Sequence, residues 1–191
     1  FGAISILQDR EFGFLKEILV SPVPRSSIAL GKILGGASIA LLQALPIILM
    51  APLAGISISL DLAGNLLPPM ILFALILSAI GVAITSRLKS LDAGQYVFQF
   101  ITFPLVMLSG AFFPLRNLPA WLDILTKINP LSYGVDLLRR ISFEYSGLPT
   151  EAITALSPTI NGNIVPIYLE YAVMAIFGII LIVFASRSFN K

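Results

Sequence analysis

The chain has 191 residues, of which 57% are hydrophobic and 12% charged, with a mean hydropathy of +0.95 and a net charge of +2. Soluble domains are typically about 45–50% apolar and about 25% charged, so this composition predicts an integral membrane protein. The small net charge and the lack of basic blocks argue against a nucleic-acid partner, and a sequence without cysteine or histidine has no disulfides, no thiolate and no imidazole base.

The chain opens on Phe1 and an apolar stretch over residues 1–7, which is typical of the end of a membrane span and lacks the basic residues of a signal peptide. We expect the sequence to be a fragment whose N-terminal part is missing. A charged segment follows at residues 8–25, with apolar residues at helical spacing and a Ser-Pro-Val-Pro run at 21–24 that ends the pattern. The segment is predicted to be a short cytoplasmic helix that either docks onto a partner or anchors a loop.

Four apolar stretches are long enough to cross a hydrocarbon core of about 30 Å, which takes roughly 20 helical residues. They cover residues 33–53, 66–85, 96–115 and 164–185. Prolines inside them are tolerated because neighbouring helices satisfy the freed backbone groups. The sequence therefore predicts an all-α fold, a polytopic bundle of membrane helices that forms a single transmembrane domain over residues 1–191.

Lys and Arg set the orientation of the bundle. Eight of the twelve basic residues lie before the first span, between the second and third spans, or after the fourth span. Four crossings place these three segments on the same side of the membrane. The positive-inside rule therefore predicts that they are cytoplasmic.

The outer loop, residues 116–163, contains two short amphipathic helices separated by the turn pair Asn129-Pro130, with Ser132 as the expected N-cap of the second helix. Trp121 lies on the apolar face of the first helix, as suits a position at the outer membrane interface.

Two sets of charges on the outer side are candidate functional residues. Asp136 and Arg139 are three residues apart and are expected to form an exposed pair worth roughly 0–1 kcal/mol, as a local brace or as part of an outer gate. Glu170 is the one carboxylate well inside a predicted span, which makes it a functional hypothesis by default. Its position near the outer end also allows the charge to reach hydrated lipid headgroups, so both interpretations stay open.

The order of residues adds a more specific observation. The charged segment contains Glu11-x-Gly13, then Leu15-x-Glu17-x-Leu19-x-Ser21-Pro22-x-x-Arg25, followed by Leu30-Gly31-Lys32. The outer loop contains Phe113-Pro-Leu, Leu118-Pro-x-Trp121-Leu, Asn129-Pro-Leu-Ser-Tyr133 and Val135-Asp136-x-x-Arg139. These runs, in this order over essentially the whole chain, resemble the permease subunits of type-2 ATP-binding cassette transporters, and most closely the drug-resistance, daunorubicin-type exporter branch. Phe14 and Lys16 depart from the family pattern E-x-G-T-L-E-x-L-L-x-x-P, which puts individual contacts of that helix in doubt.

The resemblance implies six spans in the whole protein, of which the four here are the third to sixth. It also implies that residues 8–25 form the coupling helix, seated in a groove of a separate ATP-binding cassette ATPase subunit. The positions that match the coupling motif are Glu11, Gly13, Leu15, Glu17, Leu19, Pro22 and Arg25. The positions that match the outer motif, as a gate or a brace, are Trp121, Asn129, Pro130, Asp136 and Arg139.

The expected function is the membrane part of an exporter for drug-like, lipid-like or other amphipathic molecules, with a role in multidrug or antibiotic resistance, in the plasma (inner) membrane of a prokaryote. A second permease copy, identical or related, would complete the path within membrane lipid. The sequence has no G-x-x-x-x-G-K-[ST] phosphate loop, so ATP and Mg would bind to the partner subunit and this chain would hold no cofactor or metal and catalyse no reaction.

Two alternatives stay open. An ion-coupled secondary transporter would need charged or broken-helix coordination near the membrane midplane, which only Glu170 approaches. A membrane-integral lipid-modifying enzyme would need clustered acidic or histidine residues at one interface.

Overall fold

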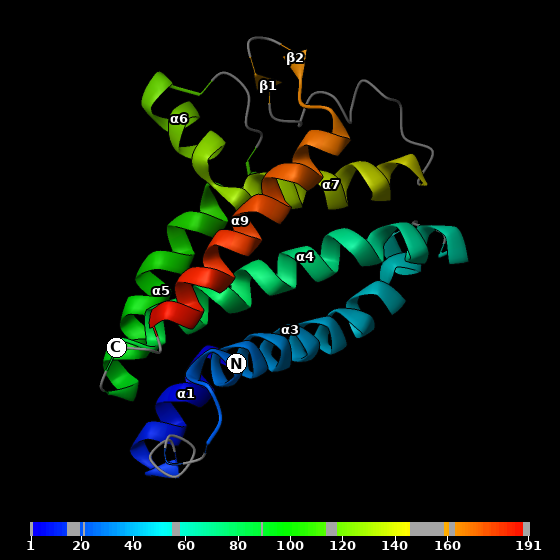
Figure 1. The fold of residues 1–191 in the computed structure, drawn as a ribbon. Coiled ribbons are helices and arrows are strands. Elements are labelled where there is room, and N and C mark those ends of the chain that lie inside the picture. The colour runs from blue at the N-terminus through cyan, green and yellow to red at the C-terminus, as the bar shows by residue number, and fades with distance from the viewer. Residues whose placement is uncertain are drawn as a thin grey trace. The chain divides into compact units, whose positions relative to one another are not determined.

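The computed structural model describes residues 2–14, 20, 22–54, 58–88, 90–113, 118–145, 159–160 and 163–188. These residues are helical except for turns and one antiparallel pair of two-residue strands, in which Thr159 lies opposite Ile164. The elements are α1 (Gly2–Glu11), α3 (Arg25–Leu49), the 3-10 helix η1 (Ala51–Ala54), α4 (Leu60–Thr85), α5 (Leu91–Met107), α6 (Ala120–Ile128), α7 (Pro130–Glu144), β1 (Thr159–Ile160), β2 (Asn163–Ile164) and α9 (Ile167–Ser188) (Figure 1). The predicted helical fold is confirmed for these residues.

Three helical segments of the described chain are long and apolar enough to cross a membrane: Arg25–Leu53, Leu60–Thr85 and Ile167–Ser188. The helix that corresponds to the third predicted span, α5, has 17 residues. At 1.5 Å per residue it is about 26 Å long, slightly shorter than a hydrocarbon core of about 30 Å. A fourth complete crossing therefore stays a prediction.

Helix bounds differ from the predicted spans where a local backbone feature, and not hydropathy, starts or stops the helix. The Ser59 hydroxyl accepts the Leu62 N–H at 3.0 Å, and this N-cap starts α4 six residues before the predicted span at residue 66. The prediction that the third span runs over 96–115 was wrong at its end. The helix α5 stops at Met107, and Gly110 then adopts a φ of 79°, a left-handed conformation that terminates helices.

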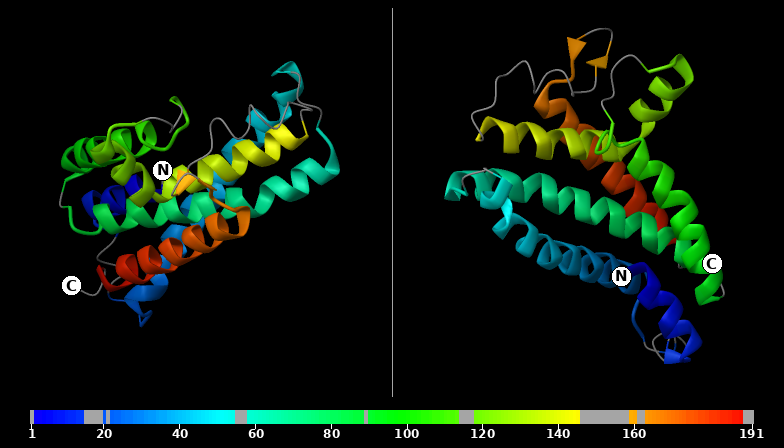
Figure 2. Two further views of the ribbon diagram at one scale, coloured as in Figure 1. Left: turned by 90° about the horizontal axis from the view of Figure 1, so that it is seen from above. Right: turned by 180° about the vertical axis from the view of Figure 1, so that it is seen from behind.

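The chain divides into two compact units. Unit 1 contains residues 1–43, 74–102 and 176–191, and unit 2 contains residues 44–73 and 103–175. In unit 1 the parts of α3 and α4 lie beside one another in the right-hand view of Figure 2, and the Ser78 hydroxyl donates to the Ile33 carbonyl at 2.8 Å. Small residues such as Ala29 and Ala79 are fully buried at this contact, as is usual where membrane helices approach closely.

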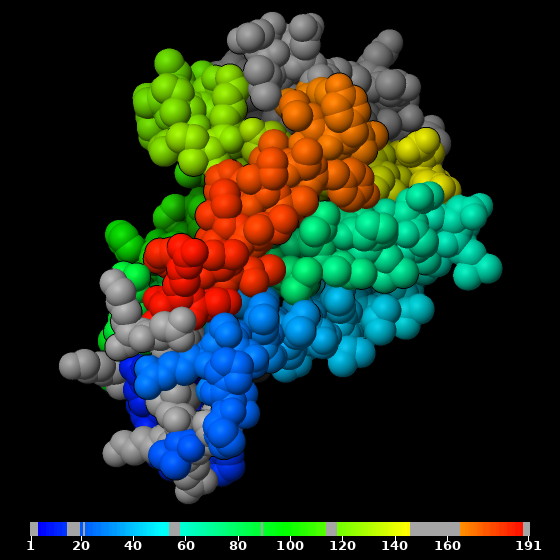
Figure 3. Space-filling view, in the orientation of Figure 1, coloured from blue at the N-terminus to red at the C-terminus, as the bar shows by residue number. Residues whose placement is uncertain are grey.

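The unit 1 part of α9 presents apolar side chains outward. Ile176, Ile179, Ile180, Val183 and Phe184 are all exposed, and the red end of α9 lies uncovered on the face shown in Figure 3. A membrane helix presents such a surface to lipid or to other helices. Exposed apolar side chains carry no hydrophobic cost there, because lipid tails are as apolar as the side chains. This exposure is therefore expected of a membrane span.

The core of unit 2 forms where α4 meets α7. Leu62 and Leu66 pack with Ile141, and the Asn65 amide donates to the Tyr145 hydroxyl at 2.7 Å. The contact thus combines apolar burial with a hydrogen bond between side chains. This packing fixes α7, which carries most of the outer candidate residues.

Gly134 of α7 marks a close approach between helices of unit 2. A Cβ at this position would overlap the Phe73 ring, lying 2.8 Å from its Cε2 atom and 3.0 Å from the Met174 Cε atom. We expect Gly134→Ala to lower the free energy of unfolding by about 1–3 kcal/mol, because the ring has to shift. Thermal unfolding of the detergent-solubilised protein measures the effect.

The matched control is Gly64→Ala in α4, where a Cβ meets nothing within 4 Å. Alanine favours a helix over glycine by about 1 kcal/mol, so the control is expected to be neutral or stabilising. A melting temperature for Gly134→Ala at or above that of Gly64→Ala would contradict the close packing.

Candidate functional site

The first candidate region is the charged segment that follows α1. The prediction of one helix over residues 8–25 was wrong at its start, because residues 8–11 belong to α1. The chain then turns at Gly13, whose φ of 77° favours glycine and whose N–H donates to the Arg10 carbonyl at 3.2 Å. Leu15, Glu17 and Leu19 lie outside the described residues, so their predicted roles stay predictions.

The described residues on both sides of that gap are exposed and partly apolar. Phe12 and Val20 have exposed fractions of 82% and 86%, and Phe14 and Val23 are exposed as well. Pro22 lies in a bend, in agreement with its predicted place before the next span. Exposed aromatic and aliphatic side chains in a segment predicted to be cytoplasmic suit contact with a protein partner.

Three consecutive side chains at the end of α1 contact three different parts of unit 1. Asp9 forms an ion pair with Lys32 of α3. Arg10 donates to the Leu88 carbonyl and, at 3.3 Å, to the Ser86 carbonyl, both directly after α4. The Glu11 carboxylate accepts the Leu91 N–H, the first of α5, at 3.1 Å.

Arg87, in the same α4–α5 turn, contacts the end of α9. Its guanidinium donates to the Ser188 hydroxyl at 3.0 Å and lies 5.3 Å from the centre of the Phe184 ring, a cation–π distance. Unit 1 therefore brings together the segments before the first span, between the second and third spans, and at the end of the fourth. These contacts agree with a topology that places the three segments on one side of the membrane, and their cytoplasmic location stays a prediction.

The second candidate region, in unit 2, is built around α7. Asn129 is its N-cap and accepts the Leu131 N–H at 3.1 Å, while Pro130 occupies the first turn, where a missing N–H costs nothing. The expectation that Ser132 caps this helix was wrong. Ser132 lies inside α7, and its hydroxyl donates to the Leu108 carbonyl at 3.0 Å.

Polar side chains of the α7 region satisfy backbone carbonyls at the end of α5. The Asn129 amide donates to the Leu105 carbonyl at 2.8 Å, and Arg139 donates to the Gly110 carbonyl. The last carbonyls of a helix have no partner within the helix, and they attract cations. The outer helix α7 therefore completes the hydrogen bonding where α5 ends.

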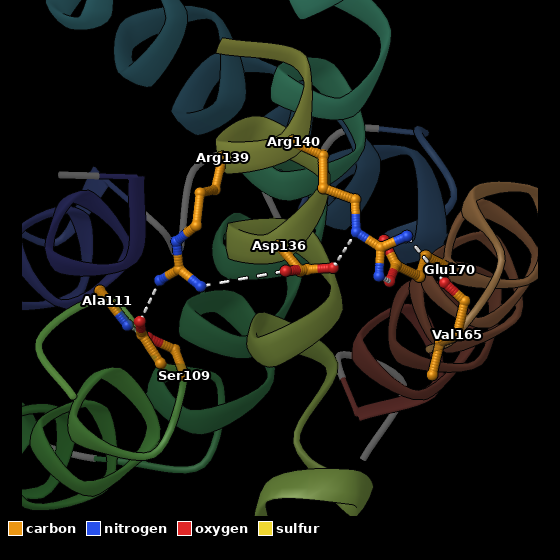
Figure 4. A network of polar contacts seen from close by, with 8 residues as sticks. Ser109, Ala111, Asp136, Arg139, Arg140, Val165 and Glu170 are labelled. Atoms are coloured by element: carbon orange, nitrogen blue, oxygen red, sulfur yellow. Dashed lines mark hydrogen bonds and ion pairs between the residues drawn. The ribbon is translucent and has the colours of Figure 1, made fainter. Parts of the chain in front are cut away.

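The charges of α7 form a buried network with α9 (Figure 4). Asp136 and Glu170 have side-chain exposures of 1% and 0%. Arg140 lies between them, with Nε 2.6 Å from an Asp136 oxygen and Nη2 3.2 Å from a Glu170 oxygen. Its Nη1 also donates to the Val165 carbonyl at 2.8 Å, and Arg139 approaches Asp136 at 3.9 Å.

The expectation of an exposed Asp136–Arg139 pair was therefore wrong, because Asp136 is buried and its shorter contact is with Arg140. Sequence reasoning missed Arg140. Its i,i+4 spacing from Asp136 could have indicated that pair. Its contact with Glu170 joins two different helices, and one sequence carries no indication of such a contact.

Attraction within this network is mainly Coulombic. The oxygens of Asp136 and Glu170 lie at ion-pair distance from arginine nitrogens, yet the contacts lack hydrogen-bond geometry. Coulomb energy in a low-dielectric site depends on distance and not on donor angle, so these short separations still favour the pairing. Burial lowers the pKa of Arg139, and the Asp136 carboxylate opposes that shift. Burial, followed by the charge of Glu170, raises the pKa of Tyr133, whose hydroxyl donates to the Lys127 carbonyl at 2.8 Å.

The helix α6 has an exposed apolar face in place of a buried one. Trp121 is 65% exposed, and Ile124, Leu125 and Ile128 are exposed with it. Lys127 pairs with Asp123 at 2.6 Å on the same helix. This pattern suits the predicted membrane interface, although contact with lipid stays a prediction.

Comparison with known proteins shows the family of this chain. The family described as "ABC-2 type transporter" matches residues 1–143. The chain is 30% identical over 152 residues to the probable multidrug ABC transporter permease YbhR of Escherichia coli (strain K12), which covers 76% of this chain and 40% of that protein. It is 30% identical over 167 residues to the putative transport permease ycf38 of Cyanophora paradoxa and 28% identical over 164 residues to that of Porphyra purpurea, with 82% of this chain and 54% of each relative covered. The chain thus spans about half the length of these relatives or less. The family match includes the charged segment and nearly all of α7, and the protein belongs to the ABC-2 type transporter family.

Proposed function

We propose that this chain is the transmembrane permease part of an ATP-binding cassette exporter that moves drug-like or lipid-like amphipathic molecules outward across a prokaryotic plasma membrane. The observation that carries the proposal is the exposed segment after α1, where Phe12 and Val20 are uncovered in a chain that has no phosphate loop. A family of ATP-driven transporters without its own nucleotide site needs a surface on which a separate ATPase acts. The multidrug permease name of one relative supports the proposed cargo class.

In this proposal the ATPase subunit binds ATP and Mg, and this chain supplies the moving part. ATP-driven closure of the ATPase pushes on the segment between α1 and α3. Because α3 starts at Arg25, directly after the segment, a displacement there reaches a helix of 25 residues. Rigid-body movement of membrane helices about such a contact switches access from one side to the other.

A second permease copy, identical or related, completes the path in the proposal. Exposed apolar side chains on the described spans provide surface both for that copy and for lipid. The ion-coupled alternative depends on Glu170, and Arg140 contacts that carboxylate at 3.2 Å. An ion pair of this kind explains the buried carboxylate without a transported ion.

The test uses the full-length permease purified from its own membrane with the proteins bound to it. We expect the double variant Glu17→Ala with Leu19→Ala to lose a co-purifying ATPase, because both positions match the coupling motif. Co-purification is measured by ATP hydrolysis and by identification of a phosphate-loop protein in the eluate.

The matched control replaces the same residue types on the predicted outer side, with Glu144→Ala and Leu125→Ala, both at exposed positions. The control is expected to retain the ATPase. Full co-purification and full ATP hydrolysis with the Glu17 and Leu19 variant would refute the coupling assignment.

A further inference from the structure

The end of α1 carries contacts that the coupling motif does not explain. The resemblance assigns Glu11 to a polar contact with the ATPase, yet its carboxylate accepts the first N–H of α5 at 3.1 Å. Arg10, the neighbouring residue, holds two carbonyls of the same α4–α5 turn. Opposite charges on adjacent residues thus hold the two ends of one turn. Arg10 contacts carbonyls that follow α4, and Glu11 contacts an N–H at the start of α5.

The electrostatics of these contacts are favourable in both cases. A helix exposes unpaired carbonyls and partial negative charge at its C-terminus, and unpaired N–H groups and partial positive charge at its N-terminus. Arg10 lies just beyond the C-terminus of α4, at two carbonyls of the turn, and Glu11 lies at the N-terminus of α5. The same turn also carries Arg87, which contacts Ser188 and Phe184 of α9. The α4–α5 turn therefore contacts α1 on one side and α9 on another, all within unit 1.

We propose that Arg10 and Glu11 are positioning residues that fix the α4–α5 turn to the end of α1, so that a force on the segment after Glu11 moves α4 and α5 together with α1. This inference rests on the proposed function, because the ATPase supplies the force. Glu11 then acts within the permease and does not dock onto the ATPase.

The test measures whether the turn stays attached to α1 through the ATP cycle. Spin labels at Gln8→Cys in α1 and Gln95→Cys in α5 report the distance, since both positions are exposed and this chain has no cysteine of its own. The full-length permease, with any cysteine outside this chain replaced, is measured with its co-purified ATPase, with and without ATP. The wild-type distance is expected to be narrow and unchanged by ATP.

Glu11→Ala removes the acceptor, and the fraction of molecules with a detached turn is expected to rise about fivefold, as for the loss of one hydrogen bond. Glu11→Gln keeps an oxygen that can accept the Leu91 N–H, so it is expected to restore the wild-type distance. Arg10→Ala is an independent second variant with the same expected effect as Glu11→Ala. All variants are expected to retain the ATPase, and equal melting temperatures show that they fold.

The outcomes distinguish the positioning role of Arg10 and Glu11 from the proposed function. If Glu11→Ala keeps the narrow wild-type distance, or if the wild-type distance itself changes with ATP, the positioning role is wrong while the proposed function stands. If Glu11→Gln and Glu11→Ala both lose the ATPase, Glu11 is a charged docking contact and the inference is also wrong. If no ATPase co-purifies with the wild-type protein, the proposed function fails whatever the distance.

Discussion

Replacement of Arg140 by methionine is expected to lower the free energy of unfolding by about 3–5 kcal/mol, the typical cost of removing one partner from a buried ion pair. The guanidinium lies 2.6 Å from Asp136 and 3.2 Å from Glu170, and both carboxylates are almost fully buried. Without Arg140, two buried carboxyl groups on different helices lose a shared cation. Methionine keeps most of the apolar volume of the arginine side chain. The lowered free energy of unfolding therefore measures the loss of the charge and not the creation of a cavity.

Thermal unfolding in detergent measures this loss, and two further variants define its cause. In Arg140→Lys one ammonium replaces three nitrogens of a planar group, so an intermediate loss is expected. The double variant Arg140→Met with Glu170→Gln removes one of the two orphaned carboxyl groups and is expected to be more stable than Arg140→Met alone. Additive effects of the two substitutions would contradict the network, because coupled residues deviate from additivity by about 0.5–3 kcal/mol.

The matched control for Arg140 is Lys127→Met in α6. Lys127 pairs with Asp123 at 2.6 Å, but both side chains are more than a third exposed. Exposed i,i+4 pairs contribute about 0.3–0.5 kcal/mol, so the control is expected to change stability little. If Arg140→Met and Lys127→Met lower the free energy of unfolding equally, burial of the ion pairs does not explain the effect of Arg140.

Replacement of Asn129 by alanine is expected to cost about 2–4 kcal/mol, because one small side chain makes two contacts. Its oxygen caps α7 through the Leu131 N–H, a contribution of about 1 kcal/mol. Its amide donates to the Leu105 carbonyl at 2.8 Å, and Asn129 is only 4% exposed. This hydrogen bond is partly buried, and a carbonyl that loses its donor in such a place costs about 1–3 kcal/mol more.

Asn129→Ser and Asn129→Ala separate the two contributions. Serine is also a good N-cap, so Asn129→Ser keeps the α7 cap and loses only the longer reach to Leu105. Its expected loss in the thermal unfolding midpoint is about half that of Asn129→Ala. If serine and alanine destabilise the protein equally, the side-chain cap of α7 contributes no stability and the proposed division is wrong.

The sequence predicts features that depend on local chemistry. The Asn129-Pro130 pair separates α6 from α7, because asparagine caps and proline tolerates the first helical turn. Long apolar runs predict α3, α4 and α9, because a membrane span needs enough apolar residues to cross the hydrocarbon. Both kinds of prediction need no knowledge of which segments are neighbours in space.

The sequence does not predict helix ends that are set by backbone conformation, and it does not predict contacts between helices. Hydropathy stays high beyond Met107, although Gly110 ends the helical path with a φ of 79°. Glu170 lies inside an apolar span and looks isolated in the sequence, yet Arg140 contacts it from another helix. Glu11 matches a docking motif, and its contact with the Leu91 N–H depends on a turn 80 residues away in the chain.

The three-way contact around Arg140 implies an order of assembly during synthesis, when N-terminal parts of a chain become available first. The contacts of α7 with the end of α5 span 24 to 29 residues, so they form as soon as the two segments have left the ribosome and entered the membrane. Asp136 is present at that stage and pairs with Arg140 from within the same helix. Glu170 arrives later with α9, and only then does the guanidinium gain its second carboxylate. Insertion of the last helix is therefore the step that completes the charge balance of the outer network.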